Sequence, residues 1–226
     1  MSMNHIIKQL IDFDIRFDKF KQCLHFLNYE IIEGDILEFG VYTGRSLLLL
    51  AYAYQKECEN QHKIDFERNV VGFDSFYGVK KSFHPRWDTD NFKYNHSFHP
   101  ILNDGDFVND TSIFDFFDAA DMKKPQIING FFKQTLPLFV EDNSIKAALI
   151  HIDCDTYDAT IEVLMNTESI MTEGTIILFD DWFNYRGGKN KGEQKAFYEF
   201  ADKSKWDFLH YGFYATFANS FIVIKK

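Results

Sequence analysis

Apolar residues in the first thirty positions recur at alternating spacings of four and three. The series is Ile6, Leu10, Phe13, Phe17, Phe20, Leu24 and Leu27. This spacing is typical of a helix that buries one face and exposes the other. It predicts one helix, or two, in an N-terminal segment of residues 1–33. That segment is expected to pack on the main domain, residues 34–226, to cover the active site or to form a dimer contact.

Beyond residue 34, short apolar runs alternate with helical patterns. The predicted strands are 35–39, 70–74, 126–128, 147–153, 175–179, 206–211 and 217–224. The predicted helices are 44–57, 111–119, 157–171 and 192–204. Strands that alternate with helices indicate a parallel sheet covered on both faces. The last two strands have no helix between them, so an antiparallel hairpin is expected at one sheet edge.

Two segments interrupt this alternation. Residues 80–110 form a long insertion rich in aromatic residues and histidine, and loops of this length are usually functional or disordered. The aromatic content argues against disorder. Residues 184–193, "NYRGGKNKGE", are glycine-rich and basic, and are expected to form either a mobile gate or an ordinary surface turn.

Charge and cysteine content narrow the class of protein. The 226 residues carry a formal charge of −10 and no long basic run, so a duplex nucleic acid partner is not expected. Cys23, Cys58 and Cys154 are widely spaced and form neither a metal knuckle nor a disulfide framework. With no secretory signal and no apolar run of transmembrane length, we expect a soluble cytoplasmic protein without a membrane partner.

The ends of the first two strands carry residues suited to a nucleoside. The stretch "EFGVYTG" supplies Glu38, Gly40 and Gly44, and its glycines permit a tight turn and close approach of a ligand. The spacing is not G-x-G-x-x-G, which disfavours a pyrophosphate cofactor. Asp74 ends the second strand, where a carboxylate can accept both hydroxyls of a ribose. Together these residues favour an adenosine-type ligand whose tail is not a phosphate.

The fourth and fifth strands end in "HIDCDTYDAT" and "ILFDDWF", which contain Asp153, Asp155, Asp180 and Asp181. If the strands are neighbours, these carboxylates converge, so either one is protonated or a cation lies among them. Oxygen ligands favour Mg²⁺, Mn²⁺ or Ca²⁺ over zinc. Asp155 is more simply explained as a cap of the following helix.

The motifs now on the page resemble the macrocin O-methyltransferase family of class I S-adenosylmethionine-dependent enzymes. The matching stretches are "LEFGVYTGRS", "VGFDSFYGV", "GFFKQTLP", "LIHIDCDTYDAT", "GTIILFDDW" and "GEQKAFYEF". The resemblance implies a Rossmann-like fold of class α/β, with a seven-stranded, mostly parallel sheet whose last strand is antiparallel. It also implies S-adenosylmethionine as cofactor, a divalent metal (Mg²⁺, or Mn²⁺ or Ca²⁺) and methyl transfer to a hydroxyl.

The resemblance also implies roles for individual residues. Those around the methionine part of the cofactor are Glu38, Gly40, Tyr42 and Ser46, with Gly44 completing the turn. Asp74 and Ser75 hold the ribose and flank the adenine. The metal ligands are Asp153, Asp180 and Asp181.

The expected reaction is displacement of the methyl group by an acceptor oxygen held in line with it. Asp153 is the candidate proton acceptor. His151, on the same strand face, is either a second base or a buried structural histidine. The expected acceptor is a sugar hydroxyl in a natural product or surface polysaccharide, or a phosphorylated metabolite held by basic side chains. Those side chains are Arg86, Arg186, Lys189 and Lys191. Two other functions remain open, a nicotinamide-dependent sugar oxidoreductase and a non-catalytic cofactor-binding or partner-binding module.

Overall fold

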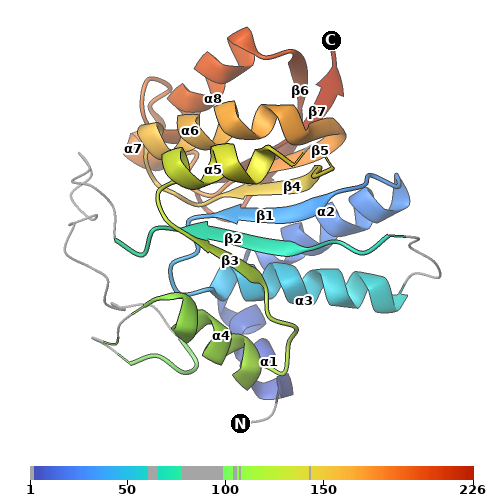
Figure 1. The fold of residues 1–226 in the computed structure, drawn as a ribbon, viewed down its shortest axis with the longest axis vertical. Helices are drawn as coiled ribbons and strands as arrows, with labels where there is room; N and C mark the ends of the chain where they lie inside the picture. Colours follow the sequence, from blue (N-terminus) through green and yellow to red (C-terminus); the bar gives the residue numbers. More distant parts are fainter. Residues whose placement is uncertain (1–2, 61–65, 78–98, 104–105, 107, 143) are drawn as a thin grey trace.

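A computed structural model describes residues 3–60, 66–77, 99–103, 106, 108–142 and 144–226. Its centre is a seven-stranded sheet with the strand order β3-β2-β1-β4-β5-β7-β6 (Figure 1). The strands are β1 (Asp35–Phe39), β2 (Val70–Asp74), β3 (Gln126–Asn129), β4 (Ala147–Ile152), β5 (Met171–Phe179), β6 (Trp206–Tyr214) and β7 (Ala218–Lys225). The first five are parallel, and β7 runs antiparallel to both β5 and β6. The predicted fold class, including the antiparallel last strand and the edge hairpin, is confirmed.

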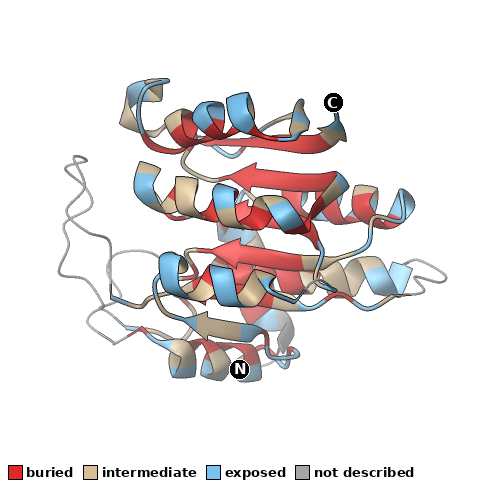
Figure 2. Cartoon of the chain, turned by 45° about the horizontal axis from the view of Figure 1, so that its top comes forward, coloured by how far each residue is buried: buried red, intermediate tan, exposed pale blue. Residues whose placement is uncertain are grey.

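Helices cover both faces of this sheet (Figure 1). One face carries α1 (Met3–Phe13), α2 (Phe17–Tyr29), α3 (Arg45–Asn60) and α4 (Asp110–Ala119). The other carries α5 (Phe132–Val140), α6 (Tyr157–Thr167) and α8 (Gly192–Lys203). Because side chains alternate along a strand, neighbouring residues pack into the cores on opposite faces of the sheet. Ile36 packs with the first set of helices and Leu37 with the second. Strands β1, β4, β5 and β7 are therefore buried on both sides over most of their length, whereas the edge strands β3 and β6 are partly exposed (Figure 2).

The N-terminal segment forms two helices that share a core with the sheet. Apolar side chains of α1 and α2 pack with those of α3 in one buried cluster. The two helices are separated at Asp14, whose Oδ1 accepts a hydrogen bond from the backbone amide of Arg16 at 3.1 Å. A side chain that bonds to nearby backbone in this way competes with helix continuation. The roles of the segment as a cover or a dimer contact remain predictions.

Two helical regions differ from the sequence-based expectation. Helix α5 was not predicted, although its N-terminal half lies in "GFFKQTLP"; Pro137 inside it obscured the helical pattern. The helix predicted for 157–171 ends at Thr167, after which a 3₁₀ turn (Glu168–Ile170) leads into β5 at Met171. The glycine-rich segment 184–193 contains a short turn, α7 (Asn184–Gly187), in which Tyr185 and Arg186 have left-handed backbone angles with φ of 58° and 61°, before α8 begins.

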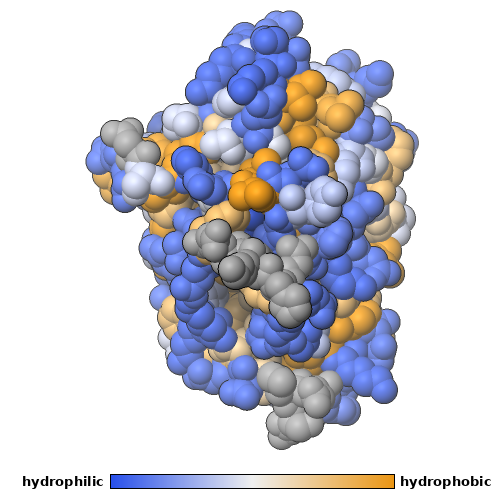
Figure 3. Space-filling model, turned by 90° about the vertical axis from the view of Figure 1, so that its right-hand side faces the viewer, coloured by the Kyte–Doolittle hydropathy of each residue, from blue (hydrophilic) through white to orange (hydrophobic). Residues whose placement is uncertain are grey.

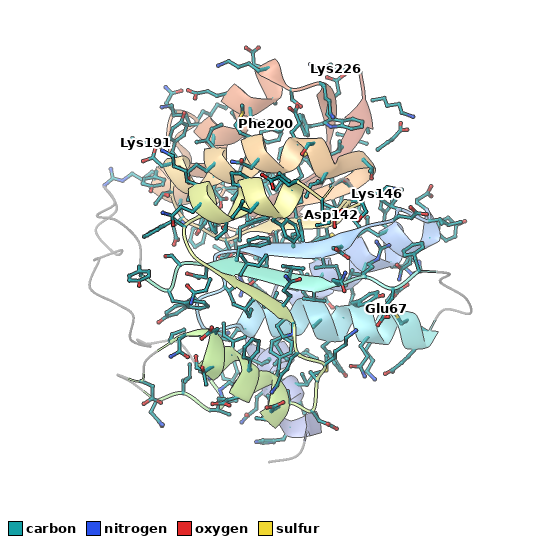
Figure 4. All side chains as sticks on the ribbon, viewed as in Figure 1. Glu67, Asp142, Lys146, Lys191, Phe200 and Lys226 are labelled. Atoms are coloured by element: carbon teal, nitrogen blue, oxygen red, sulfur yellow. The ribbon has the colours of Figure 1, made fainter. Side chains whose placement is uncertain are left out.

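The parallel strands run from the side of the molecule where Glu67 and Lys146 lie to the side where Lys191 lies (Figure 4). Figure 3 looks at the amino-end side, where hydrophilic side chains predominate around smaller hydrophobic areas. The residues with candidate chemistry lie at the opposite, carboxyl edge, as expected for an open parallel sheet. Among the helices that the structure describes, none has the length and apolar character needed to cross a membrane.

Candidate functional site

The turn after β1 is shaped by backbone contacts at the carboxyl edge. Gly40 has a φ of 93°, and a Cβ atom added there would lie 1.9 Å from the carbonyl oxygen of Asp153. Gly44 has a φ of 79°, a conformation that favours glycine. The predicted need for glycine at position 40 therefore has a local cause, the close approach of the β4 end, in addition to any ligand.

Tyr42 and Asp74 join this turn to the end of β2. Tyr42 has a φ of 44°, and its amide donates to Asp74 Oδ2 at 2.8 Å. The other carboxylate oxygen of Asp74 accepts from the amide of Phe76, also at 2.8 Å. Burial raises the pKa of the Asp74 carboxyl, and these amide donors oppose that shift. Asp74 thus lies at the end of β2, the position predicted for the residue that holds the ribose. Ser75 Oγ accepts from the amide of Tyr77 at 3.2 Å.

Glu38 is fully buried and links two parts of the site. Its Oε1 accepts a hydrogen bond from Ser46 Oγ at 2.8 Å, and its Oε2 lies 3.1 Å from His151 Nδ1. Both carboxylate oxygens are therefore engaged inside the protein. Glu38 connects the beginning of α3 to β4 and lies behind residues 40–44, which we call the cofactor turn because the predicted cofactor contacts lie on it. The family resemblance implied that Glu38 itself contacts the methionine.

Strand register brings His151 and Asp180 together with Glu38. Glu38 is the register partner of His151 across β1 and β4, so the two side chains share a face of the sheet. Asp153 and Asp180 continue the same alternation beyond the ends of β4 and β5, on the face that α1 and α2 cover. In the described part of the chain, His151, Asp153 and Asp180 are the group whose ligand atoms lie within 4.8 Å of one another. We call these three residues the acidic site.

A cation from the α1–α2 turn enters the acidic site. Arg16 Nη1 lies 2.9 Å from Asp153 Oδ2 and 3.1 Å from Asp180 Oδ2, so one nitrogen bridges both carboxylates. The rest of the guanidinium binds Asp14: Nε donates to Oδ1 at 2.9 Å and Nη2 to Oδ2 at 2.7 Å. Arg45 Nη2 lies 3.9 Å from the same Asp14 oxygen.

These neighbours set the charges in the acidic site. Burial alone would raise the pKa of Asp180, but the positive charges of Arg16 and His151 lower it to about 2. The pKa of Asp153 lies well above its usual value because the group is buried and faces the charge of Asp180. Burial lowers the pKa of His151, but Asp180 and Glu38 on its two sides raise it to about 10. His151 is fully buried, which matches the structural alternative and disfavours its assignment as a general base.

Asp181 follows Asp180 in the bend after β5 and is not part of the acidic site. Its carboxylate accepts from the side-chain amide of Asn184, and its backbone amide donates to Glu193 Oε2 at 2.9 Å. The predicted metal group of Asp153, Asp180 and Asp181 is thus divided: the structure brings the first two together with His151. Burial raises the pKa of both Asp181 and Glu193 well above the usual range.

Three residues of this region escaped the sequence interpretation. Asp14 and Arg16 interrupt the apolar stripe in "FDIRFD", and that interruption was the available signal. Glu193 is buried at the start of α8, inside a stretch that was matched only as a family motif.

The basic side chains proposed for the acceptor are on the surface where they are described. Arg186, Lys189 and Lys191 are exposed near the start of α8. Arg86, with residues 78–98 of the aromatic insertion, lies outside the described residues.

Comparison with known proteins gives one consistent group. The sequence model of the macrocin-O-methyltransferase (TylF) family matches residues 12–204. Demethyldecarbamoylnovobiocin O-methyltransferase from Streptomyces niveus is 24% identical over 191 residues, which cover 83% of this chain and 68% of the relative.

Solved structures agree on the fold. The O-methyltransferase NovP superposes with a TM-score of 0.67 at 18% identity, over 93% of this chain and 80% of that one. CalS11, described as a TDP-rhamnose 3'-O-methyltransferase of calicheamicin biosynthesis, gives a TM-score of 0.60 at 18% identity, over 97% and 80% of the two chains. Other matching structures contain S-adenosylmethionine or its demethylated product.

Proposed function

The chain belongs to the macrocin-O-methyltransferase family and is an S-adenosylmethionine-dependent O-methyltransferase. From this premise, we propose that it methylates a hydroxyl of a sugar or another small metabolite with the help of a divalent metal. One observation carries the proposal: Asp74, at the end of β2, and the acidic site, at the ends of β4 and β5, share one edge of the sheet. Family membership decides against the oxidoreductase and the non-catalytic module.

The chain's residues fit the cofactor. The carboxylate oxygens of Asp74 accept from the backbone amides of Tyr42 and Phe76, and the carboxylate held in this way lies at the carboxyl edge, where it can accept from a ribose hydroxyl. Tyr42 has 39% of its surface exposed beside that carboxylate and can line the methionine part of the cofactor. S-adenosylmethionine carries no phosphate, which agrees with a turn that departs from G-x-G-x-x-G.

The acidic site also fits a divalent cation. His151 Nε2 and Asp180 Oδ1 are buried without a hydrogen-bond partner, although they face one another at 3.9 Å. With Asp153 they form a compact set of potential ligand atoms, two of them carboxylate oxygens, and His151 would have to release its Nε2 proton to act as the third ligand. A bound divalent cation would polarise the acceptor hydroxyl and lower its pKa.

In the reaction, the acceptor oxygen attacks the methyl carbon and the carbon–sulfur bond breaks, leaving its electron pair on sulfur. The demethylated product is S-adenosylhomocysteine. Asp153, whose side chain is 24% exposed at the rim, receives the proton that the hydroxyl loses. The cofactor turn and the acidic site hold the two reactants in line, which is the main source of rate acceleration in such a displacement.

A sugar nucleotide is the acceptor class that the surface favours. Arg186, Lys189 and Lys191 place positive charge next to the carboxyl edge of a chain that is otherwise acidic. A diphosphate would pair with that charge while the sugar reaches Asp153. The description of CalS11 as acting on TDP-rhamnose supports this class.

The cofactor part is tested by calorimetry with S-adenosylhomocysteine. Asp74→Asn puts an amide against backbone donors and a ribose, so the affinity should fall by about tenfold or more. Asp142→Asn is the matched control, since Asp142 lies at the amino-end side and, among the described contacts, its carboxylate accepts only from Ser144 (Figure 4). Equal affinities for the two variants would refute the ribose role of Asp74.

The metal and acceptor parts are tested by mass spectrometry of methyl transfer to a panel of nucleotide sugars. Asp180→Asn should abolish metal-dependent turnover and leave the affinity for S-adenosylhomocysteine within about twofold. Transfer that proceeds undiminished in the presence of EDTA would show that no divalent metal takes part.

A further inference from the structure

The cation already bound in the acidic site belongs to the chain itself. Arg16 Nη1 contacts the same two carboxylates, Asp153 and Asp180, that the proposed function assigns to a divalent metal. The contacts are 2.9 and 3.1 Å long, and the Arg16 side chain is only 16% exposed. An arginine and a metal cannot both occupy the space between these two oxygens.

We propose that Arg16 is a resident cation that a divalent metal must displace from Asp153 and Asp180, so that metal binding is coupled to the position of the α1–α2 turn. The proposal rests on metal assistance in the proposed function. It goes further because it gives the N-terminal segment a defined role at the site.

The acidic site needs a cation whether or not the metal is present. Asp153 and Asp180 lie close together with side chains that are only 24% and 21% exposed, and like charges at such a site are costly unless an opposite charge compensates them. Arg16 supplies that charge from a residue 137 positions away from Asp153 and 164 away from Asp180. The two carboxylates are thereby held in place in the metal-free protein, so the metal binds to ligands that are already positioned.

The surroundings of Arg16 allow it to leave. Ile15, which precedes Arg16, is 66% exposed and Phe13 is 62% exposed, whereas Phe17, which follows Arg16, is buried, so residues 13–16 can shift while Phe17 keeps α2 on the core. Asp14 would retain a positive neighbour, because Arg45 Nη2 already lies 3.9 Å from its Oδ2. Withdrawal of Arg16 would free one oxygen of Asp153 and one of Asp180, next to Asp180 Oδ1 and His151 Nε2, which have no hydrogen-bond partner.

Competition of this kind weakens the apparent metal affinity of the intact protein. Only the molecules in which Arg16 has withdrawn can bind the metal. The apparent dissociation constant is the intrinsic one divided by the fraction of such molecules, so it rises as that fraction falls. Removing the guanidinium should therefore tighten metal binding, although Arg16 itself is no metal ligand. A residue with a purely structural role would not produce this gain.

The test is a Mn²⁺ titration of the full chain, followed by electron paramagnetic resonance of free Mn²⁺ and by calorimetry. Arg16→Gln should bind Mn²⁺ about tenfold more tightly than the unmodified protein. The matched control is Lys21→Gln, which removes one positive charge from the exposed side of α2 and should change affinity by less than about twofold. Unchanged or weaker binding in Arg16→Gln would overturn the proposal.

Arg16→Lys covers the case in which Arg16→Gln fails to fold. A lysine keeps the charge but lacks the planar fork that holds Asp14 while it bridges Asp153 and Asp180, so Mn²⁺ affinity should still rise. An affinity equal to that of the unmodified protein would contradict displacement.

Hydrogen exchange provides an independent readout of the turn. Mn²⁺ should speed exchange of the backbone amides of residues 14–20 in the unmodified protein, because Arg16 is released. Slower exchange would show that Arg16 stays in place and would overturn the proposal.

The outcome also separates this proposal from the proposed function. If no variant binds Mn²⁺, the displacement model is wrong, while binding of S-adenosylhomocysteine and chelator-resistant methyl transfer would leave the methyltransferase function intact. If Mn²⁺ binds with the expected order of affinities but no S-adenosylhomocysteine binds, the cofactor assignment fails and the displacement model stands.

Discussion

The cofactor turn and the acidic site neutralise their carboxylates by different means. Asp74 accepts hydrogen bonds from backbone amides of Tyr42 and Phe76, one of them two residues away in the sequence. Asp153 and Asp180 instead share Arg16, which comes from the α1–α2 turn near the other end of the chain. Backbone donors are fixed by the fold, whereas an arginine side chain can be exchanged for another cation. The first region therefore keeps one fixed geometry, whereas the second can exchange one cation for another.

The largest expected effect comes from the point where the two regions touch. Gly40→Ala would place a Cβ atom 1.9 Å from the carbonyl oxygen of Asp153, in a backbone conformation that alanine also disfavours. We expect a loss of about 4 kcal/mol or more in the free energy of unfolding, measured by urea denaturation, or failure to fold.

Gly212→Ala separates steric clash from backbone strain. Gly212 has a φ of 109°, but a Cβ atom there would meet only Lys19 Nζ, at 4.0 Å. This control should cost about 1–2 kcal/mol, the price of the conformation alone. Comparable losses in the two variants would mean that the approach of β4 to the cofactor turn does not constrain Gly40.

Glu38 connects the two regions and gives the next largest effect. Glu38→Gln removes the negative charge that faces His151 Nδ1 at 3.1 Å in a fully buried position. The free energy of unfolding should fall by about 2–4 kcal/mol, because a buried charge loses its partner. Urea denaturation of Glu38→Gln and of Ser46→Ala, which removes one hydrogen bond to Glu38 and should cost about 1 kcal/mol, provides the comparison.

The same pair of variants decides what Glu38 does for the cofactor. If Glu38 supports the cofactor turn from behind, Glu38→Gln should lower the free energy of unfolding and change the affinity for S-adenosylhomocysteine only modestly. An unchanged free energy of unfolding with an affinity loss above about tenfold would instead restore the direct methionine contact that the sequence suggested.

The pattern of strands and helices in the sequence predicts where the cofactor turn lies, but it does not predict which charges meet in the acidic site. The alternation of strands and helices gives the sheet and puts Asp74, Asp153 and Asp180 at its carboxyl edge. No local pattern reveals that Arg16 pairs with Asp153 and Asp180, because that contact depends on how α1 and α2 pack on the sheet.

The smallest expected effect concerns the pH dependence of the cofactor side. His99 Nδ1 accepts from the amides of Ile101 and Leu102 at 3.3 and 3.0 Å, so its proton is on Nε2, 3.3 Å from the carbonyl oxygen of Thr43. This neutral form ties the segment before α4 to the cofactor turn. Burial lowers the pKa of His99 to about 4, from 6.5 for a free side chain.

The unfolded chain therefore binds more protons than the folded one between pH 6.5 and pH 4, and the contribution of His99, complete above pH 6.5, is lost as the pH falls through 4. His99→Gln can keep an acceptor for Ile101 and Leu102 and a donor for Thr43 but does not titrate. The free energy of unfolding of His99→Gln should therefore fall less than that of the unmodified protein as the pH is lowered through this window, with a difference of about 1–3 kcal/mol at pH 4. Parallel stability curves for the two proteins would show that protonation of His99 does not weaken its contacts with the cofactor turn.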